Sequence, residues 1–127
     1  MYLDSSAIVK LVVAEPESAA LRRNLRGKAA LVSSALARTE VARALLPFGE
    51  RAIEHGEEIL GRLELIRVSD RILAAAGSLL PWELRTLDAI HLATARQLAG
   101  DLARMITYDA RLYAAATASG CRVAAPR

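Results

Sequence analysis

Short apolar blocks and longer helix-periodic blocks alternate along the chain. Apolar runs of strand length, bounded by polar or turn residues, predict β-strands, and apolar residues that recur every three to four positions predict amphipathic helices. We expect strands at residues 1–4, 29–33, 63–68, 105–108 and 121–124. We expect helices at residues 7–14, 16–25, 35–46, 72–80, 87–98 and 111–119, and a less regular helical segment with three glycines at 48–62.

Capping and stop residues stand where these helices are expected to begin and end. A side-chain oxygen at the N-cap accepts a hydrogen bond from a free backbone N–H group, whereas glycine and proline end helices. We expect N-caps at Ser6, Ser34, Ser69 and Thr86. We expect helix stops at Gly27, Pro47, Pro81, Gly100 and Gly120.

The segment at 87–98 has a strong helical period and carries an acid in its first turn. Leu87, Ile90 and Leu98 recur on one face, which predicts a buried stripe. Free N–H groups and the helix dipole favour a carboxylate at a helix start, so a stabilising first-turn acid is one interpretation of Asp88. A functional interpretation of Asp88 therefore depends on the rest of the chain.

Strands that alternate with helices predict an α/β fold. Parallel strands need crossover connections, usually helices, and these cover both faces of the sheet. We expect one domain over residues 1–127 with a central, mostly parallel sheet. Sites in such sheets form at the carboxyl ends of the strands, where Asp4 and Asp109 fall. Asp88, at a helix start, points to the same edge.

The amino-acid composition excludes some classes of protein but does not identify the function. The chain of 127 residues is long enough to bury a core, and its one cysteine excludes an internal disulfide and a cysteine-based zinc site. The net charge of +3 comes from scattered arginines and two lysines, so charge favours nucleic-acid binding only slightly. The sequence has no long apolar run and no positively charged signal-peptide start, which predicts a cytoplasmic protein without membrane contact.

Four acids are candidates for one site: Asp4, Glu40, Asp88 and Asp109. Carboxylates that lie close together in a partly buried cleft stay ionised only when cations compensate them. Hard oxygen donors without a Cys or His cluster favour Mg²⁺ or Mn²⁺ over zinc, and such ions assist phosphodiester hydrolysis. The alternative is that the four acids are separate surface or capping groups.

Four segments contain these acids in a characteristic order. They read DSSAIVKL at 4–11, TEVARA at 39–44, LDAIHLATA at 87–95 and ITYD at 106–109. Each segment alone is a weak signal, but the ordered set, at these intervals and over nearly the whole chain, resembles the PIN-domain ribonucleases. In particular it resembles the VapC toxins of bacterial VapBC toxin–antitoxin pairs. The segment at 48–61 matches the family only loosely.

The resemblance implies a Rossmann-like, three-layer α/β/α PIN domain with an endoribonuclease site that depends on Mg²⁺ or Mn²⁺. By the resemblance, the catalytic residues are Asp4, Glu40, Asp88 and Asp109, of which Asp4, Asp88 and Asp109 hold the metal. The supporting hydroxyl residues are Ser6 and Thr107. The implied partners are an RNA substrate, a VapB-like antitoxin that inhibits the enzyme, and a second copy of the chain.

Several neighbouring residues have two interpretations. Lys10, Arg85 and Arg111 are solvated charges by default, but each adjoins a site segment and is therefore also a candidate for contact with RNA phosphates. We interpret His91 as a structural or hydrogen-bonded residue, because a metal-activated water makes a histidine base unnecessary. We interpret Trp82 as a packing residue, because one tryptophan does not form a platform for nucleic-acid bases.

Other function classes compete with a ribonuclease toxin. A non-catalytic PIN-like interaction module is disfavoured because all four acids are present. A phospho-acceptor receiver domain is disfavoured because it needs a lysine near a late strand end, and the chain has only Lys10 and Lys28. Metal-dependent cleavage of DNA stays an alternative, because phosphate chemistry does not report the sugar.

Overall fold

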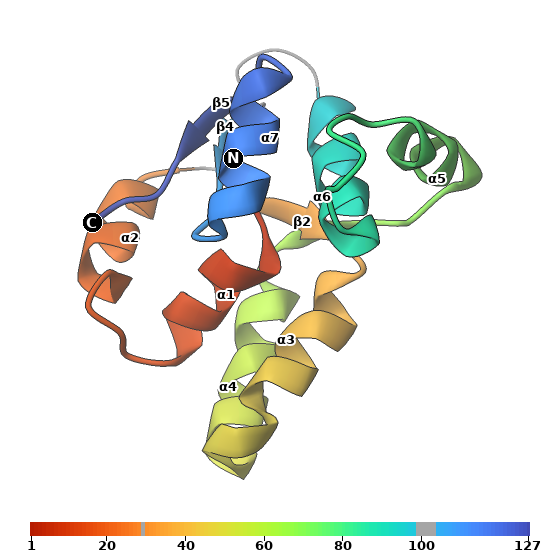
Figure 1. The fold of residues 1–127 in the computed structure, drawn as a ribbon. Helices are drawn as coiled ribbons and strands as arrows, with labels where there is room; N and C mark the ends of the chain where they lie inside the picture. The colour runs from red at the N-terminus through yellow and green to blue at the C-terminus, as the bar shows by residue number, and fades with distance from the viewer. Residues whose placement is uncertain (29, 99–103) are drawn as a thin grey trace.

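The computed structural model describes residues 1–28, 30–98 and 104–127, and these contain the expected alternation of strands and helices (Figure 1). The strands are β1 (Tyr2–Leu3), β2 (Val32–Ser34), β3 (Glu64–Ile66), β4 (Arg104–Ile106) and β5 (Arg122–Ala124). The helices are α1 (Ser5–Val12), α2 (Ser18–Leu25), α3 (Ala37–Leu45), the 3₁₀ helix η1 (Leu46–Phe48), α4 (Glu50–Gly61), α5 (Asp70–Gly77), α6 (Thr86–Arg96) and α7 (Ala110–Ala118). The expected strand start at Ala29 and helix stop at Gly100 lie outside the described residues. No helix in the described ranges is long and apolar enough to cross a membrane.

The five strands form one sheet in the order β3-β2-β1-β4-β5. β1 lies at the centre, where Tyr2 pairs with Val32 of β2 and Leu3 pairs with Ile106 of β4. Every pair of neighbouring described strands is parallel, which confirms the expected sheet. The carboxyl ends of β1 and β4 therefore lie side by side, and this is where sites form in parallel sheets.

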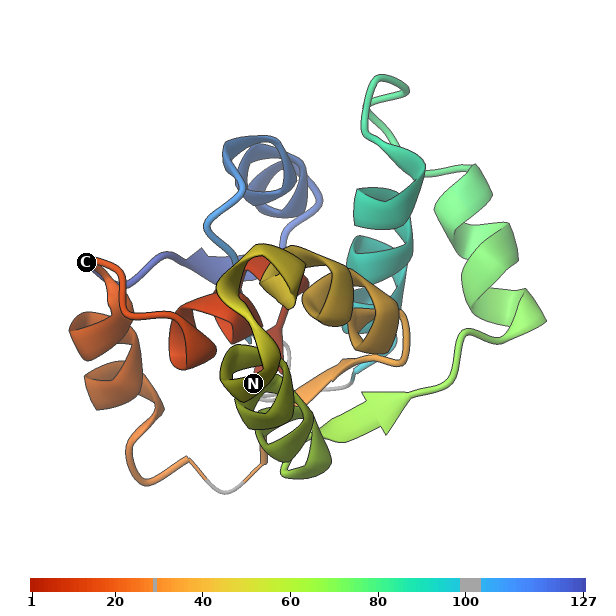
Figure 2. The same ribbon diagram turned by 90° about the horizontal axis from the view of Figure 1, so that it is seen from below.

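Successive residues of β1 face two different helical layers, as the two-residue period of a strand requires. Leu3 belongs to the core under α1 to α4, whereas Tyr2 belongs to the core under α6 and α7. α5 packs outside α6, with Ile72 against Ile90. Figure 2 shows α7 and α4 on opposite sides of the strands. The predicted three-layer α/β/α architecture is confirmed.

Three N-cap predictions are wrong, while the one at Ser69 is confirmed. Asp4 caps α1 in place of Ser6, because its carboxylate accepts a charge-assisted hydrogen bond from the backbone. Thr86 is already helical and follows Arg85, which caps α6 without a side-chain hydrogen bond. α3 begins two residues later than expected, after a turn, so its N-cap is not Ser34.

Two apolar side chains expected to pack are exposed. Leu87 is 46% exposed and Trp82 is 82% exposed. α6 packs against α5 at Ile90 and against the sheet core at Leu92, and every residue from Ala89 to Ala95 is buried. The buried part of the helix is therefore wider than the predicted stripe and begins after Leu87. Trp82 lies in the connection between α5 and α6, which explains its exposure.

α4 is one continuous helix, more regular than the three glycines in its region predict. Gly56 lies at the close approach of α4 to α3, where a Cβ atom would overlap the Cδ1 atom of Leu45. Leu45 is fully buried, so it can yield only by shifting against other core residues. Glycine at this position therefore allows the two helices to pack.

Gly56→Ala is expected to destabilise the protein by about 1–2 kcal/mol, because overpacking against Leu45 outweighs a helix-propensity gain of about 1 kcal/mol. Gly61→Ala is the matched control in the same helix, since nothing lies within 4 Å of its added Cβ. The control is expected to stabilise the protein by up to about 1 kcal/mol. Denaturant unfolding measures both changes. Equal stability of the two variants would contradict the close approach of α3 and α4.

Candidate functional site

Asp4 is a buried acid at the junction of β1 and β4. It is 4% exposed, and its backbone N–H donates to the Ile106 carbonyl at 3.1 Å. Its Oδ1 accepts hydrogen bonds from Ser6 Oγ at 2.6 Å and from the Ala7 N–H at 3.0 Å. Its Oδ2 accepts a hydrogen bond from Thr107 Oγ1 at 2.6 Å. Donors from two separate segments thus hold both carboxylate oxygens.

Ser6 and Thr107 connect Asp4 to the segment that carries Asp109. Ser6 Oγ accepts a hydrogen bond from the backbone N–H of Tyr108 at 2.9 Å, and Thr107 Oγ1 accepts one from the Asp109 N–H at 3.1 Å. Asp109 Oδ1 in turn accepts two backbone N–H groups in the first turn of α7 and caps that helix. The structure therefore places both predicted hydroxyl residues between the first and the last acid.

Arg85 bridges the two remaining aspartates. Its Nε donates to Asp88 Oδ2 at 3.0 Å, and its Nη2 donates to Asp109 Oδ2 at 2.9 Å. The hydrogen bond with Asp88, followed by the charges of both carboxylates, raises the pKa of Arg85. Figure 1 shows the first turns of α1, α6 and α7 at the same edge of the sheet. Asp88 and Asp109 therefore converge on one cationic group.

Glu40 approaches from α3. Its Oε1 accepts hydrogen bonds from Ser5 Oγ at 2.8 Å and from His91 Nε2 at 2.5 Å. Burial acts to raise the pKa of Glu40, but the hydrogen bond from His91, then the one from Ser5 and the charge of Arg85, lower it below its usual value. Glu40 is consequently ionised at neutral pH.

The donor set suits a hard divalent cation. All four acids supply carboxylate oxygens, the ligands that such ions prefer. Burial raises the pKa of Asp4, although hydrogen bonds from Ser6, Thr107 and the Ala7 N–H act in the opposite direction, so a nearby cation would favour the ionised form. Across the described ranges, no three or more Asp, Glu, His or Cys side chains already form a metal-binding cluster. The acids instead form three groups: Asp4 with its hydroxyl donors, the Arg85-bridged pair, and Glu40 with Ser5 and His91.

The three basic residues near the site differ in their surroundings. Lys10 pairs with Glu15 and Glu17, and its Nζ lies 4.9 Å from the ring centroid of Tyr108. Its side chain is only 12% exposed. The Arg85 side chain is 59% exposed, and Arg111 is exposed in the first turn of α7.

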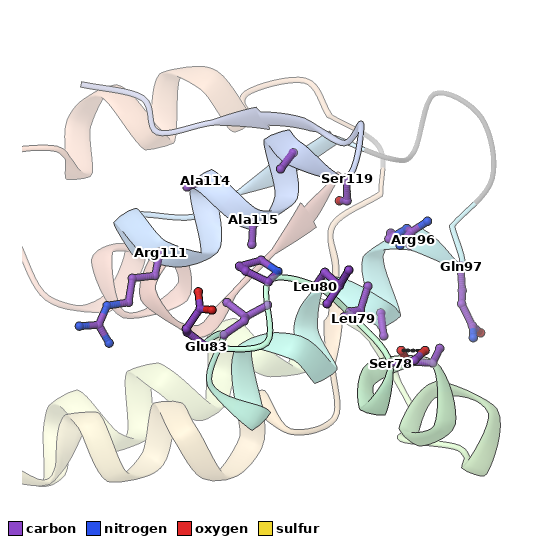
Figure 3. Close-up of a pocket in the computed structure, with 15 residues that line it drawn as sticks. Ser78, Leu79, Leu80, Glu83, Arg96, Gln97, Arg111, Ala114, Ala115 and Ser119 are labelled. Atoms are coloured by element: carbon purple, nitrogen blue, oxygen red, sulfur yellow. Dashed lines mark hydrogen bonds between the residues drawn. The ribbon is translucent and has the colours of Figure 1, made fainter.

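An open groove of about 1270 Å³ lies next to the acidic edge, between the α5–α6 connection, α6 and α7 (Figure 3). Figure 3 shows Arg111 and Arg96 towards its two ends, with Leu79, Leu80 and Ala115 between them. None of the four acids lines this groove. The groove is therefore a neighbour of the site and separate from it.

Tyr2 and Ser5 also belong to the site, although neither was predicted from the sequence. Tyr2 Oη lies 2.6 Å from His91 Nδ1, and Ser5 Oγ lies 3.3 Å from His91 Nε2. The interpretation of His91 as a hydrogen-bonded residue is confirmed, since it is 2% exposed and contacts these side chains and Glu40. The sequence does contain a signal for this contact. Tyr2 lies in a buried strand and His91 lies among apolar residues, and buried polar side chains need hydrogen-bond partners.

Comparison with known proteins gives consistent matches. Residues 1–118 match the PIN domain family. The chain is 61% identical to "Ribonuclease VapC46" of Mycobacterium tuberculosis over 126 residues, which cover 99% of this chain and 97% of that protein. It is 39% identical to "Ribonuclease VapC35" of the same species, over 99% of this chain and 96% of that protein.

Two solved structures have the same fold. One is the crystal structure of Mycobacterium tuberculosis VapC20, described as a sarcin-ricin loop cleaving toxin, with a TM-score of 0.75, 17% identity, and coverage of 94% of this chain and 95% of that one. The other is a toxin–antitoxin complex from Klebsiella pneumoniae, with a TM-score of 0.72, 19% identity, and coverage of 99% and 97%. Ribonucleases of this family generally depend on divalent metal ions. With its parallel sheet and its acids at the carboxyl edge, the chain belongs to the PIN-domain family and, within it, to the VapC ribonucleases.

Proposed function

We propose that this protein is the toxin of a type II toxin–antitoxin pair, an endoribonuclease that uses Mg²⁺ or Mn²⁺ to hydrolyse RNA phosphodiester bonds. The observation that carries the proposal is a hydrogen-bond network among four segments. Thr107 links Asp4 to Asp109, Arg85 links Asp109 to Asp88, and Ser5, next to Asp4, bonds Glu40. The 61% identity with a protein named as a ribonuclease supports the reaction class.

The four acids divide into two roles. Asp4, Asp88 and Asp109 hold the cation, and Ser6 and Thr107 orient the first and last of these acids. A bound Mg²⁺ or Mn²⁺ supplies Lewis-acid stabilisation of phosphodiester oxygens and lowers the pKa of water. Glu40, kept ionised beside this group, orients the attacking water and accepts its proton.

Exposed arginines beside the acids bind the RNA backbone. Arg85 and Arg111 present guanidinium groups that suit phosphate geometry, and both lie next to the proposed metal ligands. Lys10 is the weakest of the three candidate contacts, because its side chain is only 12% exposed, against 59% for Arg85, and is paired with Glu15 and Glu17. These contacts with phosphates position the RNA on the enzyme and do not select its base sequence.

Two protein partners complete the proposal. A cognate VapB-like antitoxin inhibits the enzyme, in keeping with the fold shared with a toxin–antitoxin complex. A second copy of the chain forms a homodimer through the apolar patch around the groove, where Leu80 and Trp82 are 73% and 82% exposed. Exposed apolar patches beside a groove are typical of protein interfaces.

Asp88→Asn is expected to lower the rate of RNA cleavage in Mn²⁺ by at least about 100-fold, because it removes one of the carboxylates that hold the metal, whose charge stabilises the transition state. Asp70→Asn is the matched control, since Asp70 is also a first-turn helix aspartate but lies on exposed α5. The control should cleave within about twofold of the wild type. Gel assays on an RNA and on DNA of the same sequence give both comparisons. Equal rates for the two variants, or preferred cleavage of DNA, would contradict the proposal.

Metal binding is expected to stabilise the wild type but not Asp4→Asn. At about 100 times its Kd, Mn²⁺ adds about 2.7 kcal/mol to the free energy of unfolding, or a rise in Tm on the order of 10 °C. The folded-state pKa of Asp4 is raised, so ionisation above its ordinary range opposes folding. Without metal at neutral pH, Asp4→Asn should therefore be at least as stable as the wild type. Thermal unfolding with and without Mn²⁺ measures both effects, and an equal Mn²⁺ response of the two proteins would reject Asp4 as a ligand.

The homodimer is expected to depend on Trp82. Trp82→Ser should raise the dimer dissociation constant by about 30-fold, corresponding to an interface residue worth about 2 kcal/mol. Phe48→Ser is the control, because Phe48 is 56% exposed but lies in η1, away from the groove. Light scattering over a dilution series measures the mass relative to the 13.6 kDa chain. A wild type that stays monomeric at high concentration would exclude this interface.

A further inference from the structure

His91 links three elements through one buried ring. It lies in α6, its Nδ1 is 2.6 Å from Tyr2 Oη in β1, and its Nε2 is 2.5 Å from Glu40 Oε1 in α3. The rings of Tyr2 and His91 meet edge to face, with centroids 5.9 Å apart. The imidazole is 2% exposed, so protein atoms fix its orientation.

The partners determine which nitrogen carries a proton. Glu40 is ionised, and a carboxylate only accepts hydrogen bonds, so His91 Nε2 must donate. Once Nε2 carries the hydrogen, Nδ1 is left as an acceptor, and the Tyr2 hydroxyl, 2.6 Å away, is the donor that it faces. A neutral imidazole with its hydrogen on Nε2 satisfies both bonds at once.

The two donors to Glu40 converge on the same oxygen. Ser5 Oγ and His91 Nε2 both donate to Oε1. Among the described residues, none donates a hydrogen bond to Oε2. This arrangement fixes the carboxylate at one oxygen and leaves the other available to a water molecule.

We propose that His91 is a positioning residue for the ribonuclease reaction: held by Tyr2, it orients Glu40 so that Oε2 receives the proton of the attacking water. The inference rests on the role proposed above for Glu40. His91 itself contacts neither substrate nor metal and acts only through Glu40.

Kinetics of three variants test this role. His91→Leu fills the site without a donor and is expected to lower kcat by about 10- to 100-fold, the range typical of a lost orienting partner, with KM within about twofold. His91→Gln places an amide N–H near Glu40 and should recover kcat to within about fivefold of the wild type. In a Glu40→Gln background, His91→Leu should cause no further loss, because the two residues act as a unit. An unchanged kcat in His91→Leu, or an equal additional loss in the Glu40→Gln background, would overturn the proposal.

A spectroscopic readout tests the same link without activity. Nitrogen NMR of the His91 ring is expected to show a protonated Nε2 whose signal shifts in Glu40→Gln, and an Nδ1 signal that shifts in Tyr2→Phe. An unprotonated Nε2 in the wild type would overturn the proposal. These two variants keep His91 itself, so the measurement stands even where His91→Leu does not fold.

The outcomes separate this inference from the proposed function. Normal cleavage by Asp88→Asn overturns the assignment of the site. A fully active His91→Leu beside an inactive Asp88→Asn overturns only the positioning role.

Discussion

The buried carboxylate of Asp4 is the constraint around which the site is arranged. A carboxylate out of contact with water is unfavourable unless hydrogen bonds or cations compensate it. Here Ser6, Thr107 and a backbone N–H supply the compensation, and they come from both sides of the β1–β4 pair. The parallel pairing of these strands therefore cannot shift register without leaving the charge without partners.

The remaining acids depend on this pairing in turn. Thr107 and Ser6 fix the turn that carries Asp109, and Arg85 links Asp109 to Asp88 on α6. α6 also carries His91, whose bonds extend the network to Glu40 on α3. Two apolar cores, one on each face of the sheet, offset the unfavourable burial of this polar network. Buried charged and polar groups that do not help the protein to fold are expected at functional sites.

The elements, and the position of Asp4 and Asp109 at the carboxyl edge of the sheet, could be predicted from sequence, because the local pattern of residues determines both. Hydrophobic period defines the strands and helices, and acids at strand ends fall at one edge of a parallel sheet. The capping error at Ser6 has a local cause: the Asp4 carboxylate, a strong acceptor, accepts the Ala7 N–H and starts the helix at Ser5, which leaves Ser6 inside the first turn. Exposure of Leu87 and Trp82 could not be predicted, because it depends on where α5 and α7 end relative to α6.

The hydrogen bonds between side chains of the site could not be predicted from sequence, for a different reason. Tyr2 and His91 are 89 positions apart, and their contact depends on the register of β1 and the rotation of α6 together. The bridge of Arg85 to Asp109 spans 24 positions and likewise depends on how α6 sits beside α7. Sequence spacing identifies which residues have suitable chemistry, and tertiary packing decides which of them meet.

A crystal structure with Mn²⁺, using the anomalous signal of the metal, tests the central claim most directly. The account predicts an anomalous peak bound by carboxylate oxygens of Asp4, Asp88 and Asp109, with Arg85 withdrawn from the two aspartates it bridges. A peak elsewhere in the protein, or no peak at saturating Mn²⁺ with Arg85 still paired, would contradict it.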